Sequence, residues 1–239
     1  MSTSSADGPT LFELARQCLR DVEGGYELLA PKFDQTPFRT PPTLSEALVA
    51  AAVASGPVTD ALDLCCGTGA LLGPLLPHVP GRLVGLDLSQ HMLDVARQRL
   101  RGQRPVELLR GDARALPFTR AFDLVVSAGA FGHFLPAELP RVLDGVARAL
   151  RPGGRFVLVT ATAPRWGTGA WVREAAFDAA MRARNALVDP PFVMYYATFR
   201  WPSPAPLLRA AGLVPMALPL GPSDPTGRLV VVTARRPSP

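Results

Sequence analysis

The sequence is poor in the residues that cross-link chains, ligate metals or span membranes. It has only three cysteines (Cys18, Cys65 and Cys66) and three histidines, and no Cys/His spacing matches a zinc site. So few cysteines are typical of a reducing, cytoplasmic compartment. No apolar run approaches membrane-spanning length, and no basic segment precedes an apolar core at the N-terminus. We therefore expect a soluble, cytoplasmic protein with no membrane association and no metal.

Charge is also sparse, at 19% of the residues, and the net charge of +5 is carried almost entirely by arginine. The arginines are scattered, often on polar helix faces, as with Arg97, Arg99 and Arg101. A nucleic-acid partner would require a clustered basic stripe, so we interpret these arginines as solvated surface. The 239 residues, 48% of them hydrophobic, predict a globular chain with a substantial core.

The most informative motif in the sequence is a glycine turn. Ala61–Leu64 is a short, mostly apolar run, followed by Gly67-Thr-Gly69 and a second apolar run from Ala70. This order predicts a buried strand, a tight turn and the start of a helix. Glycines at 67 and 69 would let the backbone approach a nucleotide-like ligand. By itself the turn also fits a dinucleotide site or tight packing.

Acidic residues follow the next two predicted strands. Leu83–Asp87 ends on an acid that could accept hydrogen bonds from both hydroxyls of a ribose, and Asp112 follows a third short strand. With these acids, residues 61–160 resemble the class I S-adenosylmethionine-dependent methyltransferases. The matching segments are Leu62–Gly69, Gly85–Ser89, Met92–Leu93, Gly111–Ala113, Phe122–Val125 and Leu150–Gly154.

The resemblance implies S-adenosylmethionine as cofactor and S-adenosylhomocysteine as product. Asp63 would orient the glycine turn and meet the methionine ammonium, directly or through water. Asp87 would meet the ribose hydroxyls and Asp112 the adenine amino group. Cys65 stands where the family often has its first glycine, and we expect its thiol to be packed rather than nucleophilic. The other implied cofactor contacts are Gly67, Gly69, Leu88, Met92, Ala113, Ser127 and Ala128, with Cys65 itself included among them.

His133, just beyond the fourth predicted strand, is the candidate general base. The resemblance implies that this position faces the transferred methyl group, and an imidazole titrates in the useful range. The alternative is a histidine that only forms local hydrogen bonds or shapes the pocket.

Aromatic residues outside the predicted sheet could line an acceptor pocket. The proline-broken segment that holds Tyr26 and Phe33 would fold over the site as a lid, or would merely attach the N-terminal helix to the core. The predicted acceptor contacts are Tyr26, Phe33, Phe131, Trp166, Trp171, Tyr195 and Tyr196. Residues 189–192 are similar to the Asp-Pro-Pro-aromatic tetrad of amino-group methyltransferases, but they follow a predicted helix and are expected to end it.

Alternating strands and helices predict an α/β fold, namely a doubly wound, Rossmann-like, mostly parallel sheet of seven strands with an antiparallel last strand and helices on both faces. Residues 1–43 would form an N-terminal helix and lid segment, and residues 44–239 the methyltransferase domain with an insertion at about 162–203. Expected helices are 11–22 (ended by Gly24-Gly25), 44–54 (capped near Thr43 or Ser45), 70–76, 90–101, 139–150, 169–188 and 204–211. Expected strands are 61–64, 83–87, 106–109, 122–128, 156–160, 214–218 and 229–234, with a tight turn at 151–154.

These features predict methyl transfer to a small, apolar or aromatic acceptor at oxygen, nitrogen or carbon, by in-line displacement in a lidded pocket. The alternatives are an RNA or protein methyltransferase, a nicotinamide dehydrogenase and a non-catalytic cofactor-binding fold. The dehydrogenase fingerprint expects glycine or alanine at position 72, where this chain has Leu72, and it leaves Gly111–Ala113 without a role. The pattern fits either a monomer or a homodimer.

Overall fold

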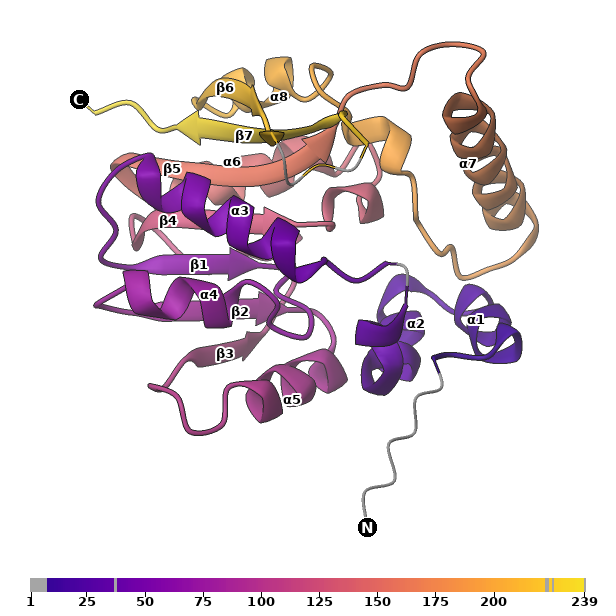
Figure 1. Cartoon of the computed structure of the whole chain (residues 1–239), viewed down its shortest axis with the longest axis horizontal. Coiled ribbons are helices and arrows are strands. Elements are labelled where there is room, and N and C mark those ends of the chain that lie inside the picture. The colour runs from indigo at the N-terminus through magenta and orange to yellow at the C-terminus, as the bar shows by residue number, and fades with distance from the viewer. Residues whose placement is uncertain (1–7, 37, 222–223, 225, 239) are drawn as a thin grey trace.

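A computed structural model describes residues 8–36, 38–221, 224 and 226–238, so the first seven residues of the predicted lid segment lie outside the described residues. In this part of the chain, seven strands form one sheet in the order β3-β2-β1-β4-β5-β7-β6 (Figure 1). They are β1 Ala61–Leu64, β2 Leu83–Asp87, β3 Glu107–Arg110, β4 Phe122–Ala128, β5 Leu150–Ala161, β6 Val214–Pro219 and β7 Leu229–Arg235. Strand β7 runs antiparallel to both of its neighbours, which confirms the predicted fold.

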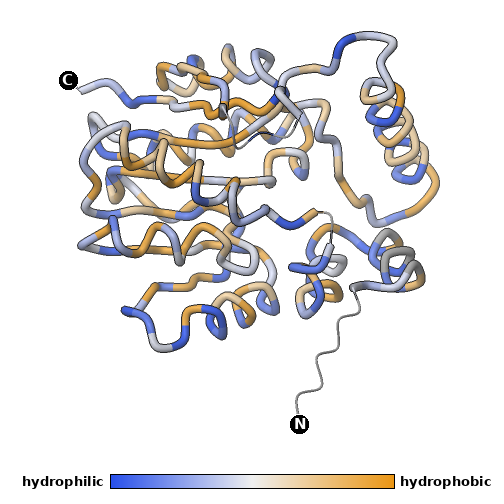
Figure 2. Tube along the Cα trace, in the orientation of Figure 1, coloured by the Kyte–Doolittle hydropathy of each residue, from blue (hydrophilic) through white to orange (hydrophobic). Residues whose placement is uncertain are grey.

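Apolar side chains on both faces of the sheet form two cores, and hydrophobic residues run along the central strands (Figure 2). Leu62 of β1 lies opposite Val84 and Val125, and all three are fully buried. This is the expected environment of a parallel sheet that is covered on both sides. Helices α3 Pro42–Ala54, α4 Leu72–Leu75 and α5 Gln90–Arg99 contribute to one core, and α6 Leu139–Ala149 and α8 Ala205–Ala210 to the other.

The N-terminal helices differ from the sequence prediction. The single helix expected over residues 11–22 is wrong, because α1 covers Leu11–Cys18 and a second helix, α2, covers Val22–Leu29. Asp21 caps α2 by accepting a hydrogen bond from the backbone N–H of Gly24 at 2.8 Å. Gly25 therefore lies inside a helix instead of ending one. A Cβ at this position would lie 2.6 Å from the Phe192 ring, so packing against a distant segment requires the glycine.

Two further local predictions are wrong. Helix α3 begins after Pro41 without a side-chain cap, so neither Thr43 nor Ser45 has the predicted capping role. The helix predicted over 139–150 ends at Ala149, because Leu150 already pairs with Phe122 as the first residue of β5. Pairing resumes at Arg155, so residues 151–154 loop out between the two as the predicted turn, with Gly153 at a φ of 78°. By contrast, α5 begins at Gln90 as predicted, and Ser89 caps it by accepting from the Met92 N–H at 3.1 Å.

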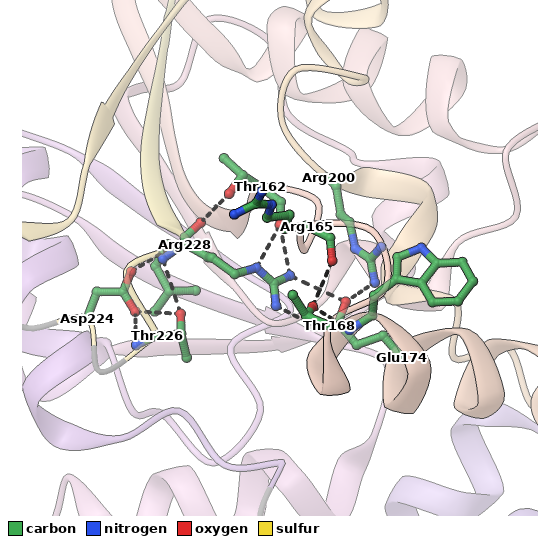
Figure 3. Close-up of polar contacts among 10 residues, drawn as sticks. Thr162, Arg165, Thr168, Glu174, Arg200, Asp224, Thr226 and Arg228 are labelled. Atoms are coloured by element: carbon green, nitrogen blue, oxygen red, sulfur yellow. Dashed lines mark hydrogen bonds and ion pairs between the residues drawn. The ribbon is translucent and has the colours of Figure 1, made fainter.

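The insertion after β5 carries α7 Gly169–Leu187, which lies beyond the carboxyl ends of the parallel strands, as do α1 and α2 (Figure 1). Its first turns are fixed by Glu174, which pairs with Arg200 and, at 2.7 Å, with Arg228 (Figure 3). Arg228 also donates to the carbonyl oxygen of Thr162 at 2.8 Å. Short 3-10 turns η1 Ala30–Gln35, η2 Leu76–His78, η3 Ala113–Ala115, η4 Phe131–His133 and η5 Tyr196–Phe199 complete the described elements. No helix among the described residues is long and apolar enough to cross a membrane.

Candidate active site

A cavity of about 500 Å³ lies at the carboxyl ends of β1, β2 and β4. The chain passes from β1 to β2 on one side and reaches β4 on the other, and open α/β sheets bind ligands where the strand order reverses in this way. The loops after four strands supply residues 65–68, 87–89, 111–114 and 128–130 to the wall. Residues from α2, η1 and the segment after α7 complete the lining.

The first wall is the glycine turn. Gly67 and Gly69 have φ values of 52° and 79°, in the left-handed region that glycine adopts without strain. A Cβ on Gly67 would meet nothing within 4 Å, whereas one on Gly69 would lie 3.1 Å from the Ala96 Cβ. Gly69 is therefore needed for packing against α5. Gly67 lines the cavity, and it leaves open the space that a side chain would occupy.

Asp87 connects this turn to the end of β2. Its two carboxylate oxygens accept from the Gly67 N–H at 2.8 Å and from the Ser89 N–H at 2.9 Å. Burial raises the pKa of this carboxyl, although the backbone donors oppose the shift. Since a carboxylate has about four acceptor positions, two remain for ligand hydroxyls.

Asp63 lies at the end of β1, where it is 1% exposed. Within the described part of the chain its Oδ2 is buried without a hydrogen-bond partner. Burial, and then the nearby Asp87 carboxylate, raise the pKa of Asp63 well above its ordinary value. A buried, unpaired carboxylate oxygen is costly, and a cationic ligand group would remove this cost.

Asp112 is held by an ion-pair chain that sequence reasoning missed. Arg114 donates through Nε to both oxygens of Asp112 at 2.9 Å and through a terminal nitrogen to Glu138 at 2.7 Å. The guanidinium keeps the pKa of Asp112 below its usual value although burial opposes this effect, and the two carboxylates raise the pKa of Arg114. Glu138 also accepts from the Leu135 N–H at 2.8 Å. Nothing in the sequence marks Arg114 or Glu138, because their pairing joins two separate loops.

His133 lies on η4 between two hydrogen-bond partners. Its Nδ1 is 2.8 Å from the carbonyl oxygen of Val193, which can only accept, so Nδ1 carries the ring proton. Its Nε2 is 2.8 Å from the hydroxyl of Tyr26 and 3.5 Å from that of Tyr196. Burial lowers the pKa of His133, although the bond to Val193 opposes the shift, and the imidazole is neutral at neutral pH.

The N-terminal segment is attached to the rim of the cavity by polar contacts that the sequence did not predict. Asp34 accepts from the Thr68 hydroxyl at 2.8 Å and pairs with Arg99 of α5. Glu27 accepts from the Gln90 N–H at 2.6 Å, at the start of α5. These bonds hold the segment across the glycine turn and the helix that follows β2.

Twelve of the predicted site residues line the cavity, namely Tyr26, Phe33, Cys65, Gly67, Asp87, Leu88, Met92, Asp112, Ala113, Ala128, His133 and Tyr196. Asp63, Gly69 and Ser127 do not line it. The hydroxyl of Ser127 donates to the carbonyl oxygen of Leu64 at 2.9 Å, inside the sheet. Cys65 has a φ of 58°, and burial raises the pKa of its thiol well above the usual value, which favours the inert, protonated form.

Four predicted acceptor contacts lie elsewhere, and their assignment to the pocket is corrected. The Phe131 ring is buried in the core, 4.4 Å from the Phe199 ring centroid. Tyr195 is buried under α7, and its hydroxyl accepts from Asn185 at 2.7 Å. Trp166 and Trp171 are exposed by 81% and 37% and pack against each other. Long-range packing places these rings, so their local sequence could not distinguish them from pocket residues.

Residues 189–191 follow α7, which ends at Leu187 as the sequence led us to expect. The sequence did not reveal that Pro190 and Pro191 then line the cavity, next to Val193.

Comparison with known proteins agrees with this geometry. A family model described as a methyltransferase domain matches residues 61–154, the span that supplies β1 to β4 and the loops carrying Asp63, Asp87 and Asp112. The match covers less than half of the chain and agrees with the family and cofactor class that the sequence resemblance implied.

The relatives that match residues in this span align with less than half of this chain. A demethylmenaquinone methyltransferase of Lactobacillus johnsonii is 39% identical over 110 residues, 44% of each chain. A 2-phytyl-1,4-naphtoquinone methyltransferase of Thermosynechococcus vestitus is 39% identical over 107 residues, 44% of this chain and 47% of that one. This chain thus spans less than half the length of these curated relatives.

The fold extends further than this sequence similarity. The N-methyltransferase NodS of Bradyrhizobium japonicum, in complex with S-adenosylhomocysteine, superposes with a TM-score of 0.64 at 18% identity. The match covers 92% of this chain and all of that one. At this identity the likeness concerns the fold of the methyltransferase domain and of the segments around it.

Proposed function

We propose that this protein transfers the methyl group of S-adenosylmethionine to a small aromatic acceptor that carries a hydroxyl group, of the naphthoquinol class. The observation that carries the proposal is one cavity with two chemically different walls. One wall has the glycine turn and Asp87, and the other has Tyr26, His133 and Tyr196. A donor and an acceptor held in one such cavity can react by in-line displacement.

The residues on the first wall fit the cofactor. The free acceptor positions of Asp87 suit ribose hydroxyls, and the bare backbone of Gly67 leaves room for the ligand. Asp63 does not line the cavity but lies two residues before Cys65, which does, and its unpaired Oδ2 suits a methionine ammonium, directly or through water. The Asp112 carboxylate and Ala113 would face the adenine. When bound, the cofactor supplies a methyl group already activated on a sulfonium. The protein therefore has to orient the two molecules, exclude water and accept any proton that the acceptor releases.

The character of the second wall and the relatives support the acceptor class. Phe33, whose ring lies 5.8 Å from that of Tyr26, and Val193, whose carbonyl oxygen contacts His133, give this wall an apolar surface, and Tyr26 and Tyr196 add hydroxyl groups. Relatives matching the domain are named for demethylmenaquinone and for a phytyl naphthoquinone. A cavity of about 500 Å³ suits a small molecule better than an RNA or a protein.

We further propose that residues up to 43 act as a lid, since Asp34 and Glu27 attach that segment to α5 across the cavity rim. Residues 44–239 would then be the methyltransferase domain with its insertion at about 162–203. We place the protein in the cytoplasm because it has so few cysteines, with the thiols of Cys65 and Cys66 free.

The test has two stages. Calorimetric titration with S-adenosylmethionine, S-adenosylhomocysteine and NADH should show binding of the first two and none of the third, and Asp87→Ala should lose that binding. The protein is then supplied with radiolabelled S-adenosylmethionine and a 2-alkyl-1,4-naphthohydroquinone kept reduced by dithionite, with an unrelated RNA as the comparison acceptor. Label in the quinol supports the proposal. Label in the RNA alone, or binding of NADH alone, would refute it.

A further inference from the structure

Both ring nitrogens of His133 are occupied, which decides how this histidine can act. Nδ1 donates its proton to the carbonyl oxygen of Val193, and Nε2 accepts from the hydroxyl of Tyr26, each at 2.8 Å. In this state no lone pair of the imidazole is free toward the cavity. An acceptor bound there can reach the base only through a group that already contacts it.

Tyr26 is the group in position to do so. It lies on α2, lines the cavity, and its ring packs against Phe33 and Phe192 at centroid distances of 5.8 Å and 6.3 Å. Its phenol oxygen donates one proton to His133, and its two lone pairs serve the hydrogen bond with Tyr196 and one further donor. The other hydroxyl near Nε2, that of Tyr196, is 0.7 Å farther away, since its distance is 3.5 Å against 2.8 Å for Tyr26.

We propose that Tyr26 is a catalytic residue that relays a proton from an acceptor hydroxyl to Nε2 of His133. The inference rests on the proposed function and specifies its acceptor as an O–H acid, because only a hydroxyl donating to Tyr26 can use the relay. The acceptor proton moves to the Tyr26 oxygen while the Tyr26 proton moves to Nε2. Tyr26 stays neutral, the acceptor becomes an oxyanion and His133 becomes an imidazolium, which returns its proton to solvent after the product leaves.

The surroundings favour a concerted transfer. The titratable groups that face the pair are Tyr196 from η5, Cys65 from the loop after β1 and Asp87 at the end of β2. Burial first, and then these groups, raise the pKa of Tyr26 well above its usual value, so a free phenolate does not form. Burial lowers the pKa of His133, which keeps Nε2 unprotonated at neutral pH. Tyr26 can therefore pass a proton on but does not store a charge.

The first test measures the hydrogen bond without any turnover. In protein labelled with 15N-histidine, the His133 ring signals are assigned by their loss in His133→Asn. We expect the Nδ1-protonated tautomer in the wild type and in Tyr26→Phe, with a shift of the Nε2 signal in the variant as its hydrogen bond is lost. The phenylalanine ring keeps the packing against Phe33 and Phe192. Protonation on Nε2, or an unshifted Nε2 signal in Tyr26→Phe, overturns the relay.

The second test follows turnover of the reduced 2-alkyl-1,4-naphthohydroquinone as a function of pH. In the wild type, kcat should rise with pH until His133 is neutral and then reach a plateau. Tyr26→Phe should lower kcat by about 100-fold, the size of a lost acid–base contribution, with little change in KM. Its kcat should keep rising toward the pKa of the acceptor's own hydroxyl. Tyr196→Phe, which removes a hydroxyl from the same cavity, should raise KM but keep the plateau.

The outcomes separate the two proposals. A Tyr26→Phe variant that loses kcat but keeps the plateau has lost only a positioning contact, which overturns the relay, as does a variant with unchanged kcat. If the wild type binds S-adenosylhomocysteine but does not methylate the quinol, the proposed acceptor fails. The nitrogen signals then decide alone whether Tyr26 is bonded to Nε2.

Discussion

Asp63→Asn should stabilise the ligand-free protein and weaken its binding of the cofactor. The wild-type carboxyl is 1% exposed, and its Oδ2 has no partner in the described part of the chain. At neutral pH the folded protein must either hold this group as an unpaired anion or take up a proton to neutralise it. Asparagine has nearly the same shape and needs neither. The ligand-free fold thus bears a cost that a bound ammonium group would offset.

The size of the effect can be bounded. One atom of the asparagine amide would stay as unsatisfied as Oδ2 is, so the cost of about 1–3 kcal/mol for a buried, unsatisfied polar group is common to both proteins and only the charge differs. The cost of the charge cannot exceed that of protonating the carboxyl at neutral pH. Between the ordinary pKa of 3.8 and neutral pH, at about 1.36 kcal/mol per pH unit, protonation costs about 4 kcal/mol. For a chain of this size, each kcal/mol moves Tm by about 2–4 °C. Asp63→Asn should therefore raise Tm by several degrees.

The pH dependence of the stability follows from the direction in which the pKa of Asp63 is shifted. Because the folded pKa of Asp63 is raised, the folded state binds the proton more tightly than the unfolded state, and stability falls as pH rises from 3.8 through the folded pKa. The advantage of Asp63→Asn should grow over this interval and vanish below it. Asp112→Asn is the matched control: its carboxyl is paired with Arg114 and has a lowered pKa, so this change should slightly destabilise the protein.

Differential scanning calorimetry between pH 4 and pH 8 measures both variants, and titration with S-adenosylhomocysteine measures the loss of affinity. We expect at least a tenfold loss for Asp63→Asn, which corresponds to about 1.4 kcal/mol. An Asp63→Asn protein that is less stable than the wild type at neutral pH would refute the argument that the carboxyl is unsatisfied. Unchanged affinity would refute its contact with the ammonium.

Three further predictions address other parts of the site. Asp87→Ala should abolish detectable binding of S-adenosylhomocysteine in calorimetry while circular dichroism stays unchanged; retained affinity would contradict the ribose contact. Cys65→Gly should raise Tm by about 1–4 °C, because a cysteine at a φ of 58° bears about 1 kcal/mol of strain that glycine avoids; a lower Tm would mean that packing of the thiol outweighs the strain. Asp34→Asn should release S-adenosylhomocysteine up to about fivefold faster in stopped-flow, since a lid contact of this kind contributes at most about 1 kcal/mol. Glu13→Gln, which removes a pair within the N-terminal segment itself, is its control and should leave the release rate unchanged.

Much of the fold could be predicted because its signals are local. Runs of apolar residues such as Leu83–Asp87 mark buried strands wherever they lie, and Ser89 caps the helix that directly follows it. The left-handed conformation of Gly67 is likewise a property of the turn itself. The order of these signals along the chain was sufficient to predict the sheet and the residues proposed for the cofactor.

Only the tertiary structure decided which aromatic and ionic groups line the cavity. The Tyr26 hydroxyl contacts His133, which is 107 residues away in the sequence, whereas Trp166 remains exposed. Both were predicted to line the pocket for the same reason, as aromatic residues outside the predicted sheet. Arg114 could not be linked to Glu138 from sequence, because neither local pattern specifies a partner. Short-range interactions determine turns, caps and strands, and so the sequence alone was enough to predict where a cofactor would bind. The proposed proton acceptor and the proposed lid depend on packing between distant segments, which only the folded chain defines.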